Sequence, residues 1–352
     1  MITFIGDIHL GHKRQSFTTK MGRDRYEREV FEHAKSVIEE HNETKVIQVG
    51  DLFDKPQNSD RVMAEGIRLA SSTDGIISGN HDLLNSDGKP TTLSLISEQL
   101  GGLTPVIRPH FTEPRMYRVP YKGNLIASVP YCYTQALFEQ SLAMAEEHAK
   151  GEDVPGKKVL VLHTNYALEF DMNETTNNLT KARAKELLKT FDYVLSGHEH
   201  NSSTHLGGRL IMTGSLMPLS MSEMTNKYVW HLTEAGEIEK TLVWSPEGKY
   251  VVIDCNEMPE HLSVGTQFVD VVGQADPGDM PKVMKRIAGW WNTCETLLVC
   301  RPSIDLRATK AEQLTETGAL SVTAQLRQLL PNAQLRDAFD TLITEVQNEC
   351  AG

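Results

Sequence analysis

Short apolar runs alternate with amphipathic stretches over residues 1–200. Within residues 25–41, for example, Tyr26, Val30 and Ala34 recur at the spacing that gives a helix one apolar face. Strands that alternate with helices are typical of an α/β fold. The pattern predicts strands over residues 2–5, 46–49, 76–78, 125–129, 159–162 and 193–195, and helices over residues 25–41, 61–71 and 91–100.

After residue 209 the pattern changes to short strands separated by turn residues, as in β-hairpins. These strands are predicted over residues 210–212, 227–232 and 241–244. We expect them to join the strand at 125–129 in a second sheet. The fold class that follows is α/β, a two-sheet β-sandwich flanked by helices.

Two smaller segments follow the sandwich. A Ser-Pro-Glu-Gly turn at 245–248 ends the first predicted domain, residues 1–245. Residues 246–306 have the pattern strand, strand, helix, strand, which predicts a small α+β cap domain. Residues 307–352 carry two apolar stripes separated by Pro331 and Asn332, which predicts a C-terminal helical hairpin.

Composition narrows the class of protein. The 352 residues include 35 Lys and Arg against 47 Asp and Glu, a net charge of -12, whereas nucleic-acid binders usually carry a basic excess. No apolar run approaches the ~20 residues of a membrane span, and no basic stretch opens a signal peptide. The 5 cysteines form no Cys-x-x-Cys pair, which argues against a disulfide framework or a zinc knuckle and favours the cytoplasm.

Potential metal ligands follow the predicted strands directly. Ligands bind at the carboxyl ends of strands in open α/β folds, so these residues should converge. Each alone is more often a turn former or a solvated side chain, but their joint occurrence in order points to a site. Two carboxylates, one amide oxygen and four imidazoles suit divalent ions, with Mn²⁺ preferred and Mg²⁺, Fe or Zn possible. The predicted ligands are Asp7, His9, Asp51, Asn80, His163, His198 and His200.

This set is too large for one tetrahedral ion and too small for two closed sites. We therefore expect two divalent ions with open positions, an arrangement that clamps both oxygens of a phosphoryl displacement. A carboxylate must bridge the two ions. Asp51 is the candidate, because it follows the central strand of the sheet.

The ordered motifs Asp7-x-His9, Gly50-Asp51-x-x-Asp54, Gly79-Asn80-His81-Asp82, His163 and Gly197-His198-x-His200 resemble the calcineurin-like metallophosphoesterase superfamily. The opening Asp7-Ile8-His9-Leu10-Gly11 is similar to that of SbcD-type DNA double-strand-break repair nucleases and their phage recombination counterparts. The superfamily motifs cover residues 1–215. The nuclease resemblance rests on the Leu10-Gly11 extension, the length and the C-terminal region.

The resemblance implies roles for the individual residues. Asp7, His9, Asp51 and His200 would hold one ion, and Asp51, Asn80, His163 and His198 the other. A hydroxide activated by the two ions would be the nucleophile.

Three further residues are implied as catalytic or supporting. His81 would face the scissile phosphate, and Asp82 would hold and polarise His81 from behind. Relatives carry either His or Asp where this chain has Asp54. A carboxylate cannot donate a hydrogen bond to phosphate, so we expect Asp54 to orient His9 or His81. His12 is expected to be a solvated loop residue.

The implied function is a metal-dependent DNA exonuclease, with possible endonuclease activity, in end processing, recombination or repair. Local basic clusters could follow a phosphate backbone despite the net charge, or be ordinary solvated faces. The implied partners are DNA, an SMC or SbcC-type ATPase that binds the C-terminal helices, and a second copy of the chain through the helices at 61–71 and 91–100. The candidate DNA contacts are Lys13, Arg14, Arg23 and Arg25.

Two alternatives stay open at this point. One is another calcineurin-like phosphodiesterase or phosphatase acting on nucleotides. Serine/threonine phosphatases continue their second motif with Asp-Arg-Gly, whereas Lys55 and Pro56 follow Asp54 here. The other alternative is an inactive scaffold that tethers DNA ends, although such proteins usually lack some of the ligands.

Overall fold

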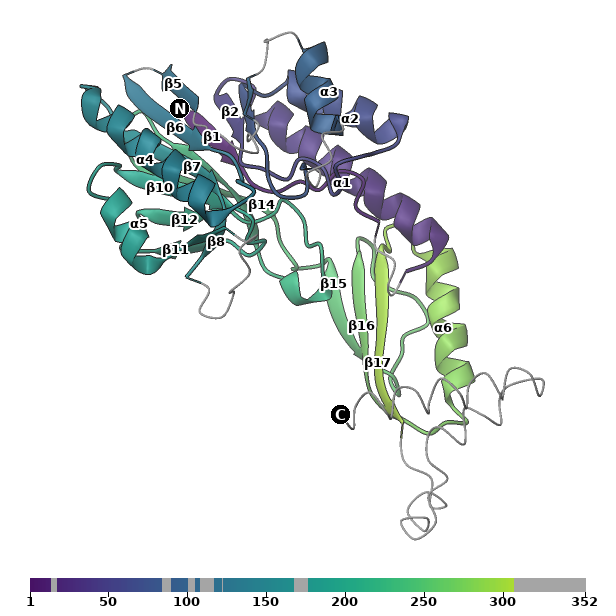
Figure 1. Ribbon diagram of the computed structural model, residues 1–352. Coiled ribbons are helices and arrows are strands. Elements are labelled where there is room, and N and C mark those ends of the chain that lie inside the picture. The colour runs from purple at the N-terminus through teal and green to yellow at the C-terminus, as the bar shows by residue number, and fades with distance from the viewer. Residues whose placement is uncertain are drawn as a thin grey trace, which may run out of the picture.

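A computed structural model describes residues 1–13, 18–83, 90–100, 105–107, 117–121, 123–167 and 177–306. Two six-stranded sheets face each other, and helices cover their outer faces (Figure 1). The predicted α/β sandwich flanked by helices is confirmed. The C-terminal helical segment predicted at 307–352 lies outside the described residues.

The first sheet has the order β14-β13-β1-β2-β3-β4. Strands β1 to β4 run parallel, and β13 pairs antiparallel with β1. Three helices connect the parallel strands. The elements are β1 (Ile2–Ile5), α1 (Lys20–Glu40), β2 (Lys45–Gln48), α2 (Asp60–Ser71), β3 (Gly75–Ile77), α3 (Thr92–Gln99), β4 (Val106–Ile107), β13 (Lys227–Leu232) and β14 (Ile238–Trp244).

The second sheet has the order β11-β12-β10-β7-β6-β5, with β6, β7, β10 and β12 parallel. Two helices and a small two-stranded sheet accompany it. The elements are β5 (Tyr117–Tyr121), β6 (Asn124–Val129), α4 (Gln135–Gly151), β7 (Lys158–His163), β8 (Asn165–Tyr166), β9 (Asn178–Leu179), α5 (Lys181–Leu187), β10 (Tyr193–Gly197), β11 (Ser203–His205), β12 (Leu210–Met212) and the 3-10 helix η1 (Met221–Glu223).

The hairpin β13-β14 differs from the prediction, because it belongs to the first sheet and not to the second. Strand β13 pairs with β1 in the register Ile2↔Leu232, and Trp230 and Leu232 enter the core between the sheets. The alternation of apolar residues predicts that a strand has a buried face, but it does not select the neighbouring strand.

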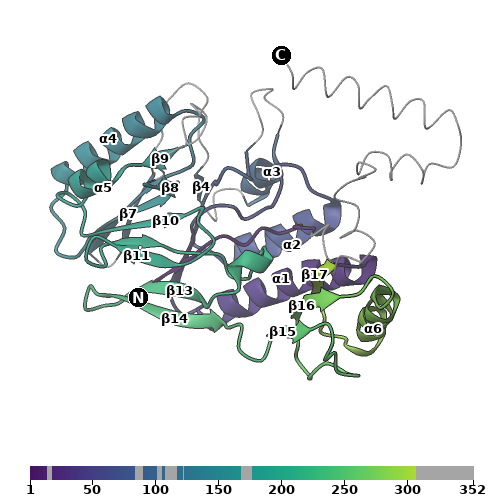
Figure 2. The ribbon, with the colours of Figure 1, turned by 90° about the horizontal axis from the view of Figure 1, so that it is seen from below.

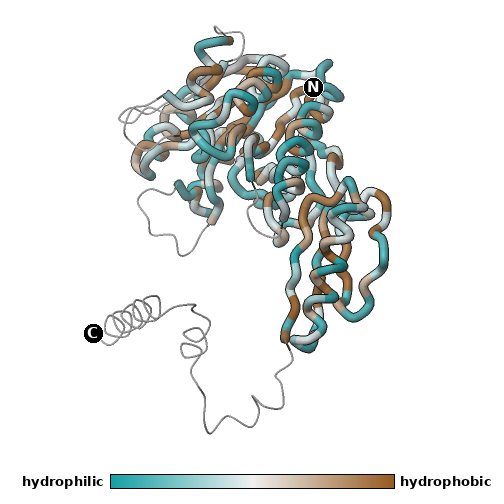
Figure 3. The backbone as a smooth tube through the Cα atoms, turned by 90° about the vertical axis from the view of Figure 1, so that its right-hand side faces the viewer, coloured by the Kyte–Doolittle hydropathy of each residue, from teal (hydrophilic) through white to brown (hydrophobic). Residues whose placement is uncertain are grey.

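Alternating side chains of each strand build the layers. Ile2 and Phe4 of β1 face the second sheet, whereas Ile5 faces the helices of the first. Helices α4 and α5 cover the opposite face of the second sheet through Phe138 and Leu187. In Figure 3 hydrophobic stretches lie inside the main body. The ends of the parallel strands are therefore held by cores on both sides of each sheet.

Residues 246–306 contain the predicted order of strand, strand, helix and strand. A parallel three-stranded sheet carries one helix and has a core of its own around Trp290 and Trp291. Figures 1 and 2 place it beside the first half of α1, away from the second sheet. The elements are β15 (Tyr250–Asp254), β16 (Phe268–Ala275), α6 (Met280–Thr293) and β17 (Val299–Leu306).

Helix α1 begins five residues earlier than the apolar pattern predicts, after the N-cap residue Thr19. Its first turns pack on the cap, where Gly22 lies against the ring of Trp291. Thr18 also donates a hydrogen bond to the Leu298 carbonyl oxygen at 2.9 Å. This tertiary contact has no periodic signal in the sequence. In the part of the chain that the structure describes, no helix has the length and hydrophobicity to cross a membrane.

Candidate metal centre

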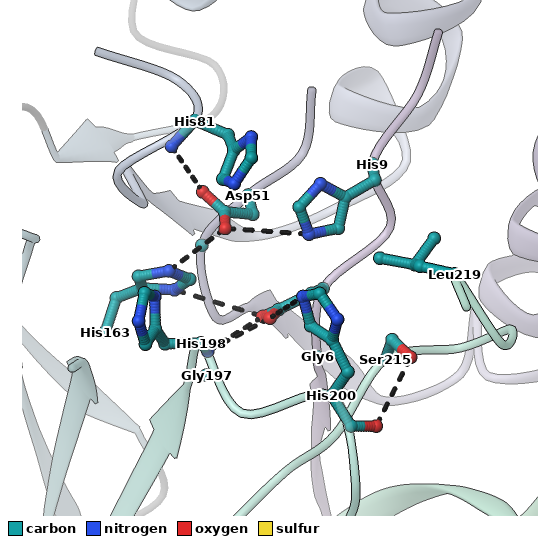
Figure 4. A network of polar contacts seen from close by, with 12 residues as sticks. Gly6, His9, Asp51, His81, His163, Gly197, His198, His200, Ser215 and Leu219 are labelled. Atoms are coloured by element: carbon teal, nitrogen blue, oxygen red, sulfur yellow. Dashed lines mark hydrogen bonds and ion pairs between the residues drawn. The ribbon is translucent and has the colours of Figure 1, made fainter. Parts of the chain in front are cut away.

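All seven predicted ligands meet where strands of both sheets end at one edge of the sandwich. Asp7 and His9 follow β1, Asp51 follows β2, and Asn80 follows β3. His163 ends β7, and the loop after β10 supplies His198 and His200. Figure 4 shows that the imidazole rings from both sheets point toward Asp51 and the loop after β1. Residues up to 193 positions apart in the sequence thus share one site (Asp7 to His200).

The backbone at this edge is strained at three ligand positions. His9, Asp51 and His198 have φ angles of 55°, 52° and 87°, in the left-handed region that non-glycine residues rarely adopt. Such conformations cost about 1–3 kcal/mol each and persist where surrounding structure imposes them, often at functional sites. Gly50 has φ 98°, and a Cβ there would overlap the His163 ring. The glycine lets the two sheets approach closely enough to share the site.

One half of the centre consists of Asp7, His9 and His200. Their potential ligand atoms lie within 4.8 Å of one another. His200 Nε2 is 3.8 Å from Asp7 Oδ2, and the His9 and His200 rings are 5.0 Å apart. The Asp7 carboxylate is fixed from behind, because the His198 amide donates to its Oδ2 at 3.0 Å.

The other half is built around Asp51, His163 and His198, whose ligand atoms also lie within 4.8 Å of one another. His163 Nε2 is 3.2 Å from Asp51 Oδ2. The Asn80 side-chain oxygen lies 3.1 Å from His163 Nε2 and 2.8 Å from His198 Nδ1. The amide oxygen therefore faces the same space as the two rings.

Asp51 lies between the two halves. Its Oδ2 is 3.6 Å from His9 Nε2 on one side and 3.2 Å from His163 Nε2 on the other. Its Oδ1 accepts a hydrogen bond from the His81 amide at 2.8 Å. This position is the one expected of a carboxylate that bridges two ions.

The donor atoms fit divalent cations. Both ring nitrogens of His9 are buried without a hydrogen-bond partner in the described structure. Buried polar atoms are normally satisfied, so an orphaned imidazole nitrogen among carboxylates points to a cation as its partner. The surrounding donors are nitrogen and oxygen atoms without a thiolate, a set that suits ions such as Mn²⁺, Mg²⁺, Fe or Zn.

The buried charges of the centre shift the pKa values of one another. Burial raises the pKa of Asp7 to about 7, although His163 opposes this shift. Burial acts on Asp51 in the same direction, but His163 and His9 outweigh it and hold its pKa below the usual value. Burial lowers the pKa of His163, yet Asp51 and Asp7 raise it to about 9. Buried carboxylates at this edge therefore need positive charge beside them.

His81 lies at the edge of the centre and is partly exposed. Its ring stands edge-on to His9 with the centroids 4.7 Å apart. Its Nδ1 lies 2.9 Å from the main-chain oxygen of Asp54, so Nδ1 carries the hydrogen and Nε2 is left for another partner. Its ligand atom lies within 4.8 Å of those of His9 and Asp51, and its partial exposure lets the ring contact a phosphate beside them.

The expected role of Asp82 needs correction. Its carboxylate accepts hydrogen bonds from the Phe53 amide at 3.0 Å and the Gly79 amide at 2.9 Å. The group behind the His81 ring is instead the Asp54 carbonyl. Asp82 thus joins the loops after β2 and β3, and burial followed by the charge of Asp51 raises its pKa to about 7.

Asp54 contacts two histidines with its carboxylate. Its Oδ1 is 2.7 Å from His12 Nδ1 and 3.4 Å from His9 Nδ1. Burial raises the pKa of Asp54, but the hydrogen bond from His12 and the nearby ring of His9 outweigh burial and lower it. The Asp54 carboxylate thus faces the ring of His9, one of the two histidines that it is expected to orient. His12 differs from the expectation of a solvated residue, because Asp54 fixes its ring.

The candidate DNA contacts have different surroundings. Lys13 is exposed and Arg23 is partly exposed. Arg25 donates hydrogen bonds to the main-chain oxygens of Cys294 at 2.9 Å and Leu297 at 3.5 Å, so it fastens α1 to the cap. Arg14 lies outside the described residues.

Two residues near the centre were not predicted from the sequence. Glu223 contacts His200 Nδ1 at 3.2 Å, and Lys227 donates to the His200 carbonyl oxygen at 2.8 Å. The sequence signal for Glu223 is the pattern Ser220-x-x-Glu223, which usually indicates a helix cap. Lys227 begins β13 as a charged residue before an apolar run, and nothing in that pattern predicts its complete burial.

The comparison with protein families agrees with this geometry. The model of the calcineurin-like phosphoesterase family matches residues 1–202, so the chain belongs to this family. A comparison with curated proteins gave no match. A solved structure described as GAP50, the anchor in the inner membrane complex of Plasmodium, is 11% identical, covers 91% of this chain and 98% of that chain, and has a TM-score of 0.36. The family and the His/Asp clusters support a metal-dependent phosphoesterase.

Proposed function

We propose that the protein is a metal-dependent DNA nuclease, an exonuclease with endonuclease activity, that acts in DNA end processing, recombination or repair. The hydrolytic part of this proposal rests on the complete set of ligands around Asp51 and on His81 beside them. The DNA part rests on the cap and on the resemblance of residues 7–11 to SbcD-type nucleases.

Two divalent ions, when bound, would supply Lewis acidity toward a phosphate oxygen and a nucleophile at neutral pH. Asp7, His9, Asp51 and His200 would hold one ion, and Asp51, Asn80, His163 and His198 the other. We propose Mn²⁺ as the physiological ion, with Mg²⁺, Fe or Zn as competitors.

The protein's own groups orient the substrate and supply a proton to its leaving oxygen. His81 is held through Nδ1 by the Asp54 carbonyl, which leaves Nε2 for the leaving oxygen of the phosphodiester. From Nε2 a protonated ring can donate a hydrogen bond or a proton as negative charge develops on that oxygen. Asp82 keeps the His81 loop in place by accepting from the Gly79 amide.

The feature that favours a polymeric substrate is the packing of the cap (residues 246–306) on α1. The segment that leaves the centre after His9 leads to α1, and the cap is fastened there by Arg25. Lys13 precedes α1 in the sequence, and Arg23 lies near the start of α1. A mononucleotide needs only the centre, whereas a duplex or a single strand can use the whole path.

The proposal includes two protein partners and a cytoplasmic location. An SMC-like ATPase would bind the helices predicted at 307–352, and deletion of residues 320–352 should then abolish co-purification with this ATPase. A second copy would pack on α2 and α3, where Leu95 is 39% exposed. The described cysteines are unpaired and buried, which is compatible with the reducing cytoplasm.

The test is cleavage of linear duplex and single-stranded DNA by the purified protein with Mn²⁺, beside a small phosphodiester. Asn80→Ala and His81→Ala are the control variants. We expect Mn²⁺-dependent DNA cleavage that both substitutions strongly reduce. Hydrolysis of nucleotides or of the small diester without DNA cleavage, even with the ATPase, would assign the protein to another phosphodiesterase class. The absence of any hydrolysis would favour the DNA-tethering scaffold.

A further inference from the structure

His200 is more exposed than His9 and His163, two other histidines whose rings lie beside Asp7 or Asp51. Its side chain is 25% exposed, whereas that of His163 is 0% exposed. The His163 ring is fixed by the main-chain oxygen of Val49 at 2.9 Å from Nδ1. His200 follows β10 in a loop, so its ring needs another partner to keep one orientation.

Glu223 is that partner. Its Oε1 lies 3.2 Å from His200 Nδ1. The carboxylate is itself held in place, because it accepts hydrogen bonds from the Leu219 amide and the Ser220 hydroxyl, both at 2.9 Å. A carboxylate only accepts, so Nδ1 carries the hydrogen. His200 Nε2 then keeps its lone pair on the side of Asp7, 3.8 Å away.

Lys227 holds the main chain of the same residue. Its side chain is fully buried, and Nζ donates to the His200 carbonyl oxygen at 2.8 Å and to Asn201 Oδ1 at 3.5 Å. Lys227 belongs to β13 of the first sheet, whereas His200 follows β10 of the second. In Figure 4 the His200 ring points into the centre and its carbonyl points away from it. The amine therefore fastens the loop of one sheet to the other sheet.

A buried ammonium is costly unless its hydrogen bonds compensate it. This one is placed behind a ligand of the metal centre, where its charge also attracts Glu223 and Asp7. Both Glu223 and Lys227 lie beyond residue 202, where the match to the family model ends. The support of His200 is thus provided by a part of the chain outside the matched stretch.

We propose that Glu223 and Lys227 are positioning residues that fix the ring and the main chain of His200, and so determine how tightly the Asp7–His9–His200 half holds its ion. This inference rests on the metal centre of the proposed function but not on DNA as the substrate. Partners of metal-binding histidines typically change metal affinity about 10–100-fold. The other half, held through Val49, should not depend on either residue.

The test is calorimetric titration of the full-length chain with Mn²⁺. We expect two bound ions in the natural protein. Glu223→Ala should weaken one of them about 10–100-fold and leave the other unchanged. Glu223→Gln keeps an oxygen that can accept from Nδ1, so it should weaken the same ion by less. Lys227→Met, which removes the amine, should also act on that ion alone. Glu239→Ala, an exposed residue of β14, is the matched control.

Thermal unfolding of the metal-free proteins separates positioning from loss of the fold. If Glu223→Ala does not fold, Glu223→Gln decides the question. Two ions bound as tightly as in the natural protein by the folded Glu223 variant would overturn the inference while the proposed function stands. Equal weakening of both ions would also overturn it. Failure of the natural protein to bind Mn²⁺ would overturn the metal centre and, with it, the proposed function.

Discussion

The two halves of the metal centre are supported in different ways. In the half that contains His163, the ring is fully buried and fixed by the main-chain oxygen of Val49. In the half that contains His9 and His200, side chains provide the support: Asp54 faces His9 Nδ1 and Glu223 faces His200 Nδ1. A main-chain support persists whenever the strands pair, whereas a side-chain support depends on single residues that can be substituted. The orientation of His163 thus follows from the fold, whereas the orientations of His9 and His200 depend on the side chains of Asp54 and Glu223.

The largest loss of activity is expected from substitution of His163, the ligand that the main chain holds in place. His163→Ala removes a ring that faces both Asp7 and Asp51. Each ion contributes several kcal/mol of charge stabilisation in the transition state, so hydrolysis should fall about 1000-fold. Steady-state kinetics with a small phosphodiester measures the loss. Activity within tenfold of the natural protein would mean that this half is not needed.

Gly50→Ala disturbs the half that contains His163 by changing the main chain beside its ring. The added Cβ would overlap His163 and sit at φ 98°, so we expect the free energy of unfolding to fall by about 3 kcal/mol. Gly248→Ala is the control, because φ there is 72° but the space around the glycine is open. It should cost only about 1 kcal/mol. Equal losses in urea unfolding would show that strain, and not the contact with His163, makes the glycine necessary.

His81→Ala should leave both halves intact. The ring lies beside His9 but is held by Asp54, so we expect turnover to fall about 100-fold with unchanged Mn²⁺ binding. Turnover at saturating substrate and a metal titration of the same sample provide the two readouts. If Mn²⁺ binding also weakens, His81 is a further ligand of the half that contains His9.

The smallest effect is expected far from both halves. Arg25→Ala removes the hydrogen bonds from α1 to the cap carbonyls of Cys294 and Leu297. Because Arg25 is partly exposed, the free energy of unfolding should fall by only about 1 kcal/mol. Hydrolysis of a small phosphodiester should not change. Arg28→Ala, an exposed residue of the same helix, is the control in urea unfolding. Equal stability of the two variants would contradict a docking role for Arg25.

The ligands that directly follow strands could be predicted from the sequence. The residues that hold these ligands in position could not. An apolar run followed by Asp7, Asp51 or His163 marks both a strand and its end, and parallel strands bring such ends together. Glu223 and Lys227 carry no such signal, because their roles depend on the pairing of β13 with β1 and on the loop that follows β10. Asp82 adjoins His81 in the sequence, but its carboxylate accepts from the Phe53 and Gly79 amides, because adjacency in sequence does not fix where a side chain points.

The fold shows the same division. The alternation of apolar residues predicts most strands of both sheets, but the sheet that receives the hairpin β13-β14 depends on long-range packing of Trp230 and Leu232. The start of α1 likewise depends on Trp291 of the cap, which is 269 positions from Gly22 in the sequence. Local patterns thus predict elements, and contacts between distant residues decide how the elements are assembled.

Two ions are expected to share Asp51 at this edge of the sandwich. A crystal structure of the protein grown with Mn²⁺, measured for anomalous scattering, tests this expectation most directly. We expect two anomalous peaks, one among Asp7, His9 and His200 and one among Asn80, His163 and His198, with Asp51 in contact with both. A single peak, or peaks away from Asp51, would contradict it.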